Sequence, residues 1–227
     1  VLPALLNAPA SLTAWGITVT ALVSAVVTPV AGRVGDMFGK RRTAIAMMLV
    51  LIAGCVVAGT ASSVEWLIIG RGLQGAGLGA TPPGIAILRD VMPPRRVASG
   101  MAIMSATMGV GGAIGLPLSA FVVGVFAWHA LFWVASLLGA LSIGLVLIFV
   151  PARDRASGGR FDVVGVLGLA LIVTAVLLLL SEGARWPAAV LAGVGILAVV
   201  VFALWVLFEL RVKDPLVDLR VASRGLC

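Results

Sequence analysis

Charged residues are scarce in this sequence. Only 11% of its 227 residues are Asp, Glu, Lys or Arg, whereas a soluble domain carries about 25%. Residues 97–152 contain none of the four. Because a soluble fold places its charged residues on the surface, this composition excludes a soluble enzyme, a secreted module and a disordered chain. With 61% hydrophobic residues and a mean hydropathy of +1.20, the chain is predicted to be a polytopic membrane protein.

Histidine and cysteine are nearly absent as well. The chain has one histidine, His129, and two cysteines, Cys55 and Cys227, which do not form a disulfide framework or a metal-binding pattern. No nucleophile–base pair is evident. No Gly-x-x-x-x-Gly-Lys-Ser/Thr loop is present to bind the phosphates of ATP. We therefore expect no catalytic residues, no metal and no cofactor.

Long apolar runs make up most of the chain. About 20 apolar residues in a helix cross the hydrocarbon core of a bilayer, and a backbone in lipid must satisfy its own hydrogen bonds. Seven segments are long enough: about 12–31, 43–61, 64–88, 98–124, 130–150, 163–181 and 186–208. The sequence therefore predicts an all-α integral membrane fold.

Basic residues give these helices an orientation. The net charge is +7, and 14 of the 16 basic residues fall in four segments on one side of the predicted spans: 33–42, 89–96, 153–160 and 211–224. Lys and Arg collect in cytoplasmic segments, so we expect this side to face the cytoplasm in a multi-pass protein of the cell (plasma or inner) membrane. The basic residues are not interleaved with aromatic ones, which argues against nucleic-acid binding.

Glycines and prolines lie within the predicted spans. Five of the 28 glycines occur at residues 70–79 and four at residues 109–115. Small residues allow helices to approach closely, whether for function or for simple packing. Two pairs have the four-residue spacing that places both glycines on one helix face: Gly75 with Gly79, and Gly111 with Gly115. We expect Pro82–Pro83 and Pro117 to interrupt their helices.

The segment between the first two spans carries a motif. Residues 32–42 read Gly-Arg-Val-Gly-Asp-Met-Phe-Gly-Lys-Arg-Arg, in which glycines permit a tight turn and the Asp can cap a helix or pair with Arg. As chemistry alone, a basic turn with a capping Asp explains the segment equally well. The segment resembles the Gly-x-Leu-x-Asp-Arg-x-Gly-Arg-Lys signature of major facilitator superfamily transporters, with Val34 in place of the Leu and Met37 in place of the first Arg. The resemblance implies a cytoplasmic gate formed by the matching residues Gly32, Asp36, Gly39, Lys40 and Arg41.

A second motif lies in the span at 64–88. Residues 67–77 resemble the fourth-helix motif of the same superfamily, Leu-x-x-x-Arg-x-x-Gln-Gly-x-Gly. An ionisable side chain inside a membrane costs roughly 2.5–3.5 kcal/mol or more and marks a candidate functional site; the alternative is that Arg71 extends to the outer surface. The resemblance implies that Arg71 and Gln74 face the central cavity and couple proton binding to substrate binding. No carboxylate lies at comparable depth in the seven spans, so we expect the partner of Arg71 on the first helix, upstream of Val1.

A third motif lies in the span at 98–124. Residues 111–120 resemble the fifth-helix motif of drug:proton antiporters, Gly-x-x-x-Gly-Pro-x-x-Gly-Gly. Gly111 and Gly115 match, Pro117 is displaced by one position, and Ser119-Ala120 replace the final glycines. Smallness is therefore retained where the motif requires it.

A methionine stripe lies on the same helix. Met101, Met104 and Met108 recur at i, i+3 and i+7. Flexible, polarizable thioethers suit a pocket that contacts varied apolar substrates. Ordinary helix packing explains the same stripe, and both interpretations stay open.

The motifs occur in the superfamily's order along essentially the whole chain, and the spans at 163–181 and 186–208 fit the extra helix pair of its fourteen-helix antiporter branch. We therefore expect three regions: an N-terminal transporter bundle with a truncated first helix at 1–150, two additional transmembrane helices at 151–210, and a cytoplasmic segment at 211–227 that leads to a C-terminal bundle outside this fragment.

The resemblance implies a proton-coupled antiporter that exports small, amphipathic or drug-like molecules by alternating access, with the proton gradient as its energy source. Its partners would be the substrate, protons, the lipid bilayer and the C-terminal half of the same chain. Two alternatives stay open. A nutrient uniporter or symporter of the superfamily would share the gate, and a non-transporting membrane sensor or scaffold would share only the helices.

The orientation leads to a labelling prediction. In a cysteine-free background, Ser157→Cys should resist a membrane-impermeant maleimide applied from outside the cell, whereas Ala184→Cys should react, because only the former lies in a basic segment. Labelling is measured on intact cells, with permeabilised cells as the control. The reverse pattern would contradict the orientation.

Overall fold

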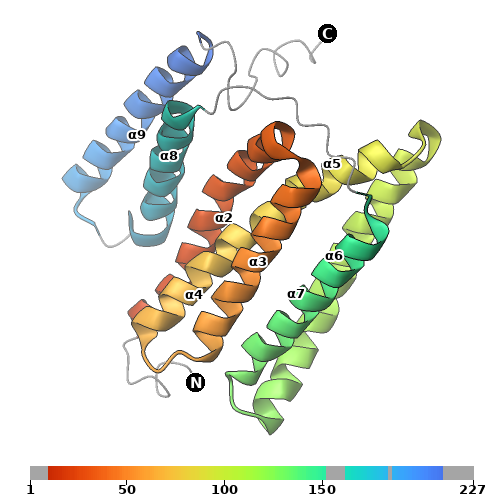
Figure 1. Cartoon of the computed structure of the whole chain (residues 1–227). Coiled ribbons are helices and arrows are strands. Elements are labelled where there is room, and N and C mark those ends of the chain that lie inside the picture. Colours follow the sequence, from red (N-terminus) through yellow and green to blue (C-terminus); the bar gives the residue numbers. More distant parts are fainter. Residues whose placement is uncertain (1–9, 152–161, 184–185, 212–227) are drawn as a thin grey trace.

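The computed structural model of the chain describes residues 10–151, 162–183 and 186–211. All regular elements in these ranges are helical, as the apolar runs predict (Figure 1). They are α2 (Ala10–Phe38), α3 (Lys40–Gly59), α4 (Val64–Gly77), a 3-10 turn η1 (Leu78–Ala80), α5 (Thr81–Val91), α6 (Pro94–Val125), α7 (Ala130–Phe149), α8 (Val163–Glu182) and α9 (Ala188–Glu209).

The long helices run up and down, so that their ends gather in two layers (Figure 1). The α2–α3 junction and the ends of α5 and α7 lie at one end, which carries the basic residues of 33–42 and 89–96. Within the described ranges, five helices are long and apolar enough to cross a membrane: α2, α3, α6, α7 and α9. The expectation of a multi-pass membrane fold is therefore confirmed.

Three of the predicted spans call for comment. The span predicted at 64–88 is divided into α4, η1 and α5. Pro82 and Pro83 lie in the first turn of α5, where a residue without an N–H loses no helical hydrogen bond. The expectation that Pro117 interrupts its helix is wrong, because Pro117 lies inside α6, which is continuous over its 32 residues. In α8 the described apolar stretch, Val164–Leu180, is shorter than the other spans, so its crossing of the membrane stays a prediction.

Glycine contacts bring α3 and α4 together. A Cβ atom on Gly54 would lie 2.7 Å from both the Gln74 nitrogen and the Gly70 oxygen, and a Cβ atom on Gly70 would lie 2.7 Å from the Ala58 nitrogen. Real Cβ atoms do not approach backbone so closely, and only glycine fits at these positions. The two backbones are therefore in direct contact at this level.

The two glycine pairs predicted from the sequence have different surroundings. Gly75 and Gly79 are closely packed against α2: a Cβ atom on Gly75 would lie 2.5 Å from the Thr20 oxygen, and one on Gly79 would lie 2.8 Å from Val27 Cγ1. At Gly111 and Gly115 a Cβ atom would meet nothing within 4 Å in the described part of the chain. The first pair confirms the close packing expected from the spacing, whereas the second has no neighbour here.

The remaining helices pack around this centre. α7 packs on α3, where Gly59 lies beside Phe132 and Trp133. α8 and α9 form a hairpin whose α8 contacts α2 (Figure 1). The hairpin is joined by a hydrogen bond from Trp205 Nε1 to the Gly165 oxygen at 2.8 Å. The predicted first-helix remnant at 1–9 and the basic segments at 153–160 and 212–227 lie outside the described residues, as do Ser157 and Ala184.

The contrast between the two glycine groups can be tested by stability. Gly54→Ala should force α3 and α4 apart and destabilise the fold by about 1–3 kcal/mol, the usual cost of overpacking. Gly111→Ala is the matched control and should be neutral or slightly stabilising, because alanine favours a helix. Thermal unfolding of the purified protein in detergent measures both. Equal midpoints for the two variants would contradict the α3–α4 contact.

Candidate functional site

The junction between α2 and α3 contains most of the predicted gate residues. The helix α2 continues to Phe38 and α3 begins at Lys40, so the tight turn that the glycines permit is confined to a single residue. Gly39 alone joins the two helices, with φ at 110°. Residues other than glycine rarely adopt this left-handed backbone conformation. Asp36 is exposed in the last turn of α2.

Small residues seat this junction on α5. A Cβ atom on Gly35 would lie 3.4 Å from Pro83 Cβ, and one on Gly32 would lie 3.7 Å from Pro82 Cβ. Gly35 and Pro83 are buried. The end of α2 therefore rests on the two prolines that begin α5, at ordinary van der Waals distances.

The basic residues of the junction reach two other helices. Lys40 Nζ forms a salt bridge of 2.6 Å with Asp90 Oδ2 at the end of α5. Arg41 Nη2 donates a hydrogen bond of 3.1 Å to the Leu147 oxygen near the end of α7. Exposed ion pairs of this kind are worth at most about 1 kcal/mol. They orient the helix ends at little cost and can be broken when the helices move.

Arg71 and Gln74 lie together on α4, as their three-residue spacing implies. Arg71 Nη1 donates to Gln74 Oε1 at 3.1 Å. The amide nitrogen of Gln74 in turn donates to Cys55 Sγ on α3 at 3.5 Å. Gln74 and Cys55 are buried, and Arg71 is half-buried. A polar chain therefore leads from α3 through Gln74 to the guanidinium.

The helix α2 fixes the other side of Arg71. The Thr20 hydroxyl shares its single proton between the Gly16 oxygen at 2.8 Å and the Arg71 oxygen at 3.0 Å. A Cβ atom on Gly16 would lie 3.8 Å from Arg71 Cγ. No salt bridge to Arg71 forms within the part of the chain that the structure describes, so its acidic partner stays a prediction.

The methionine stripe and the antiporter-like helix are placed unequally. Met101 Sδ lies 3.8 Å from Arg89 Nη2 on α5, and Met104 Cε lies 3.9 Å from the Cβ position of Gly84. Met108 is 62% exposed and lies on the part of α6 that also carries Gly111, Gly115 and Pro117, all exposed. Two of the three methionines therefore face α5, and the motif residues face away from the described helices.

Comparison with known proteins agrees with this arrangement. A sequence model of the Major Facilitator Superfamily matches residues 1–161. The chain belongs to this superfamily. The motif resemblance and the partial transporter bundle expected from it are thereby confirmed at the level of the family.

Several curated relatives of this superfamily are similar to the chain. It is 24% identical over 213 residues to the multidrug transporter protein MdtP of Bacillus subtilis, and 31% identical over 217 residues to a multidrug resistance protein B homolog of Mycobacterium tuberculosis. It is 30% identical over 215 residues to the multidrug transporter mfsC of Aspergillus fumigatus. These matches cover 90–92% of the chain but only 39–40% of each relative, so the chain spans about two fifths of their length.

Sequence reasoning missed three contacts in this superfamily member. The sequence does not pair Asp90 with Lys40, shows Cys55 only as an isolated cysteine, and shows Arg89 only as one of the basic residues of 89–96. Asp90 carried a usable signal, because it is the only acidic residue among the basic residues of 89–96. Cys55 carried none, since nothing in an apolar run shows which face meets α4.

Proposed function

We propose that the protein exports small amphipathic molecules across the cell membrane in exchange for protons, by alternating access. The superfamily membership supports a transporter, and the relatives are named as multidrug transporters or a multidrug resistance protein. The proton gradient supplies the energy, so neither a cofactor nor a metal is needed. The opposing bundle and the lipid bilayer are its structural partners.

The observation that carries proton coupling is the placement of Arg71. Its guanidinium lies inside a membrane-embedded bundle with a neutral acceptor, Gln74. Arginine does not lose its proton, so coupling requires a nearby group that changes charge. A carboxylate outside the described residues, on the helix that precedes α2 in the chain, would pair with Arg71 when ionised and release it when protonated. The binding of a proton would then shift the balance between inward-open and outward-open states.

The cytoplasmic contacts support a gate at the α2–α3 junction. Asp36, Lys40 and Arg41 occupy the ends of α2 and α3, and the two basic residues reach α5 and α7 through weak exposed bonds. Bonds worth about 1 kcal/mol or less can exchange partners without a large barrier. Gly39 allows the one-residue turn between the two helices, and Gly32 lies against Pro82 at the start of α5.

The open face of α6 supports movement of this bundle against the opposing bundle during alternating access. Gly111 and Gly115 have space around their Cβ positions, and Pro117 is exposed beside them. Small residues at these positions suit close, sliding contact with the opposing bundle. Met101, Met104 and Met108 lie on the same helix and would contact apolar parts of a substrate.

Arg71 variants of the complete protein test the coupling. Arg71→Ala should abolish pH-gradient-driven transport in proteoliposomes, and Arg71→Lys should retain only part of it, because an ammonium cannot reproduce the planar donors of the guanidinium. Arg96→Ala, which removes the same charge from an exposed position on α6, is the matched control and should transport normally.

Substrate counterflow without a gradient separates coupling from folding. Arg71→Ala should still catalyse counterflow if only the proton step is lost. Normal gradient-driven transport by Arg71→Ala would show that Arg71 merely extends to the outer interface, and would refute the coupling role.

A further inference from the structure

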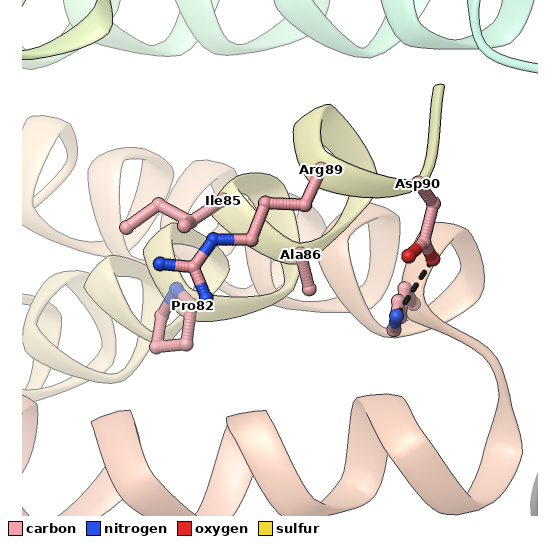
Figure 2. A pocket seen from close by; sticks show the side chains of 6 residues that line it. Pro82, Ile85, Ala86, Arg89 and Asp90 are labelled. Carbon is pink, nitrogen blue, oxygen red and sulfur yellow. Dashed lines mark hydrogen bonds and ion pairs between the residues drawn. The ribbon is translucent and has the colours of Figure 1, made fainter. Parts of the chain in front are cut away.

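A small cavity lies at the cytoplasmic end of α5, about 320 Å³ in volume and open to the outside (Figure 2). One face of α5 supplies five of its lining residues at the helical spacing i, i+3, i+4, i+7 and i+8, and the first turn of α3 supplies the sixth. They are Pro82, Ile85, Ala86, Arg89, Asp90 and Lys40. Three are apolar and three are charged, and the volume is at the lower end of small-molecule sites.

The Arg89 side chain is directed into this cavity. Helical side chains lean toward the N-terminus of their helix, and Figure 2 shows Arg89 running back along α5 toward Ile85 and Pro82. Its hydrogen-bond acceptor there is Met101 Sδ, at 3.8 Å. A thioether is a weak and uncharged acceptor. Within the described residues Arg89 forms no salt bridge, and its remaining donors are available to a ligand.

The charges of the cavity do not cancel. Asp90 is neutralised by Lys40 at 2.6 Å, and this pair turns its charges toward each other (Figure 2). Arg89 is left as one positive charge above an apolar floor made by Pro82, Ile85 and Ala86. An arginine beside an apolar surface favours a ligand with an anionic head and an apolar body.

We propose that this cavity, named here the Arg89 pocket, is a cytoplasmic loading site for amphipathic organic anions. The Arg89 guanidinium binds the carboxylate or sulfonate, and the apolar body lies against Pro82, Ile85 and Ala86. The assignment rests on the proposed export function, since an exporter must first bind its substrate on the cytoplasmic side.

Equilibrium binding tests the site without any need for transport. The complete protein in phosphatidylcholine nanodiscs is titrated with naphthalene-2-sulfonate, and with a naphthyl trimethylammonium cation as the probe of opposite charge. The anion should bind more tightly than the cation. Arg89→Gln should weaken anion binding about tenfold or more, as expected for the loss of a charge-assisted hydrogen bond. Arg95→Gln makes the same charge change at an exposed position outside the pocket and should have little effect.

Two further variants distinguish a change in the binding site from damage to the fold. Asp90→Asn frees Lys40 from its partner and should tighten anion binding by up to about fivefold, a gain that damage to the fold would not produce. Ile85→Trp fills the apolar floor and should abolish binding without changing any charge.

Three results would overturn the loading site: equal affinity for anion and cation, equal effects of Arg89→Gln and Arg95→Gln, or anion binding that disappears when phosphatidylglycerol is added to the discs. The last would assign Arg89 to a lipid phosphate. Because binding is measured at equilibrium, failure of proton coupling in the Arg71 variants would leave these results unchanged, and the two proposals fail separately.

Discussion

The direct backbone contact of α3 with α4 is the constraint on which the membrane-embedded site depends. Gly54 and Gly70 have no room for a Cβ atom, so the two helices meet in one register. That register places Cys55 opposite Gln74, and the Gln74 amide then has its nitrogen toward sulfur and its oxygen toward Arg71. A half-turn of either helix would remove the acceptor from the guanidinium. Close packing therefore determines the local chemistry.

A guanidinium held by a neutral amide is only partly satisfied in an apolar environment. Removing its charge from water is costly, and one amide oxygen compensates less than a carboxylate does. Arg71 is consequently sensitive to any charge that changes nearby. Near the end of α5, Arg89 is likewise opposed by a weak sulfur acceptor, while Lys40 and Asp90 neutralise each other. Within the described residues, neither arginine is paired with a carboxylate, and the two lie at different positions along the α4–α5 segment.

Helix positions could be predicted well from the sequence, because hydropathy alone determines where a chain crosses a membrane. The span expected at 130–150 is the helix Ala130–Phe149, and the span expected at 163–181 is Val163–Glu182. Ends in polar segments were less predictable: α2 runs to Phe38 rather than stopping near residue 31, since helical hydrogen bonding continues beyond the apolar stretch. Pro82–Pro83 predicts an interruption of the span at 64–88, whereas Pro117 shows that a proline does not always break a helix.

The site was predictable only where its residues share a helix. Arg71 and Gln74 are three residues apart, so their contact follows from helix geometry. Cys55 and Asp90 lie on other helices than their partners, and helices that are apolar on every side carry no amphipathic stripe to show how they are rotated. Glycine spacing has the same limit: Gly75/Gly79 and Gly111/Gly115 look alike in sequence, yet only the first pair meets a neighbour in the described chain.

Proton exchange is the central claim of this account, and proton movement measures it most directly. The complete protein is reconstituted in vesicles that contain a pH-sensitive dye, and a substrate gradient is imposed with no initial pH difference. We predict that downhill substrate movement drives protons in the opposite direction and changes the luminal pH, and that an empty-vesicle control stays constant. Substrate flux without any change in luminal pH would contradict proton-coupled exchange and leave a uniporter as the function of this fold.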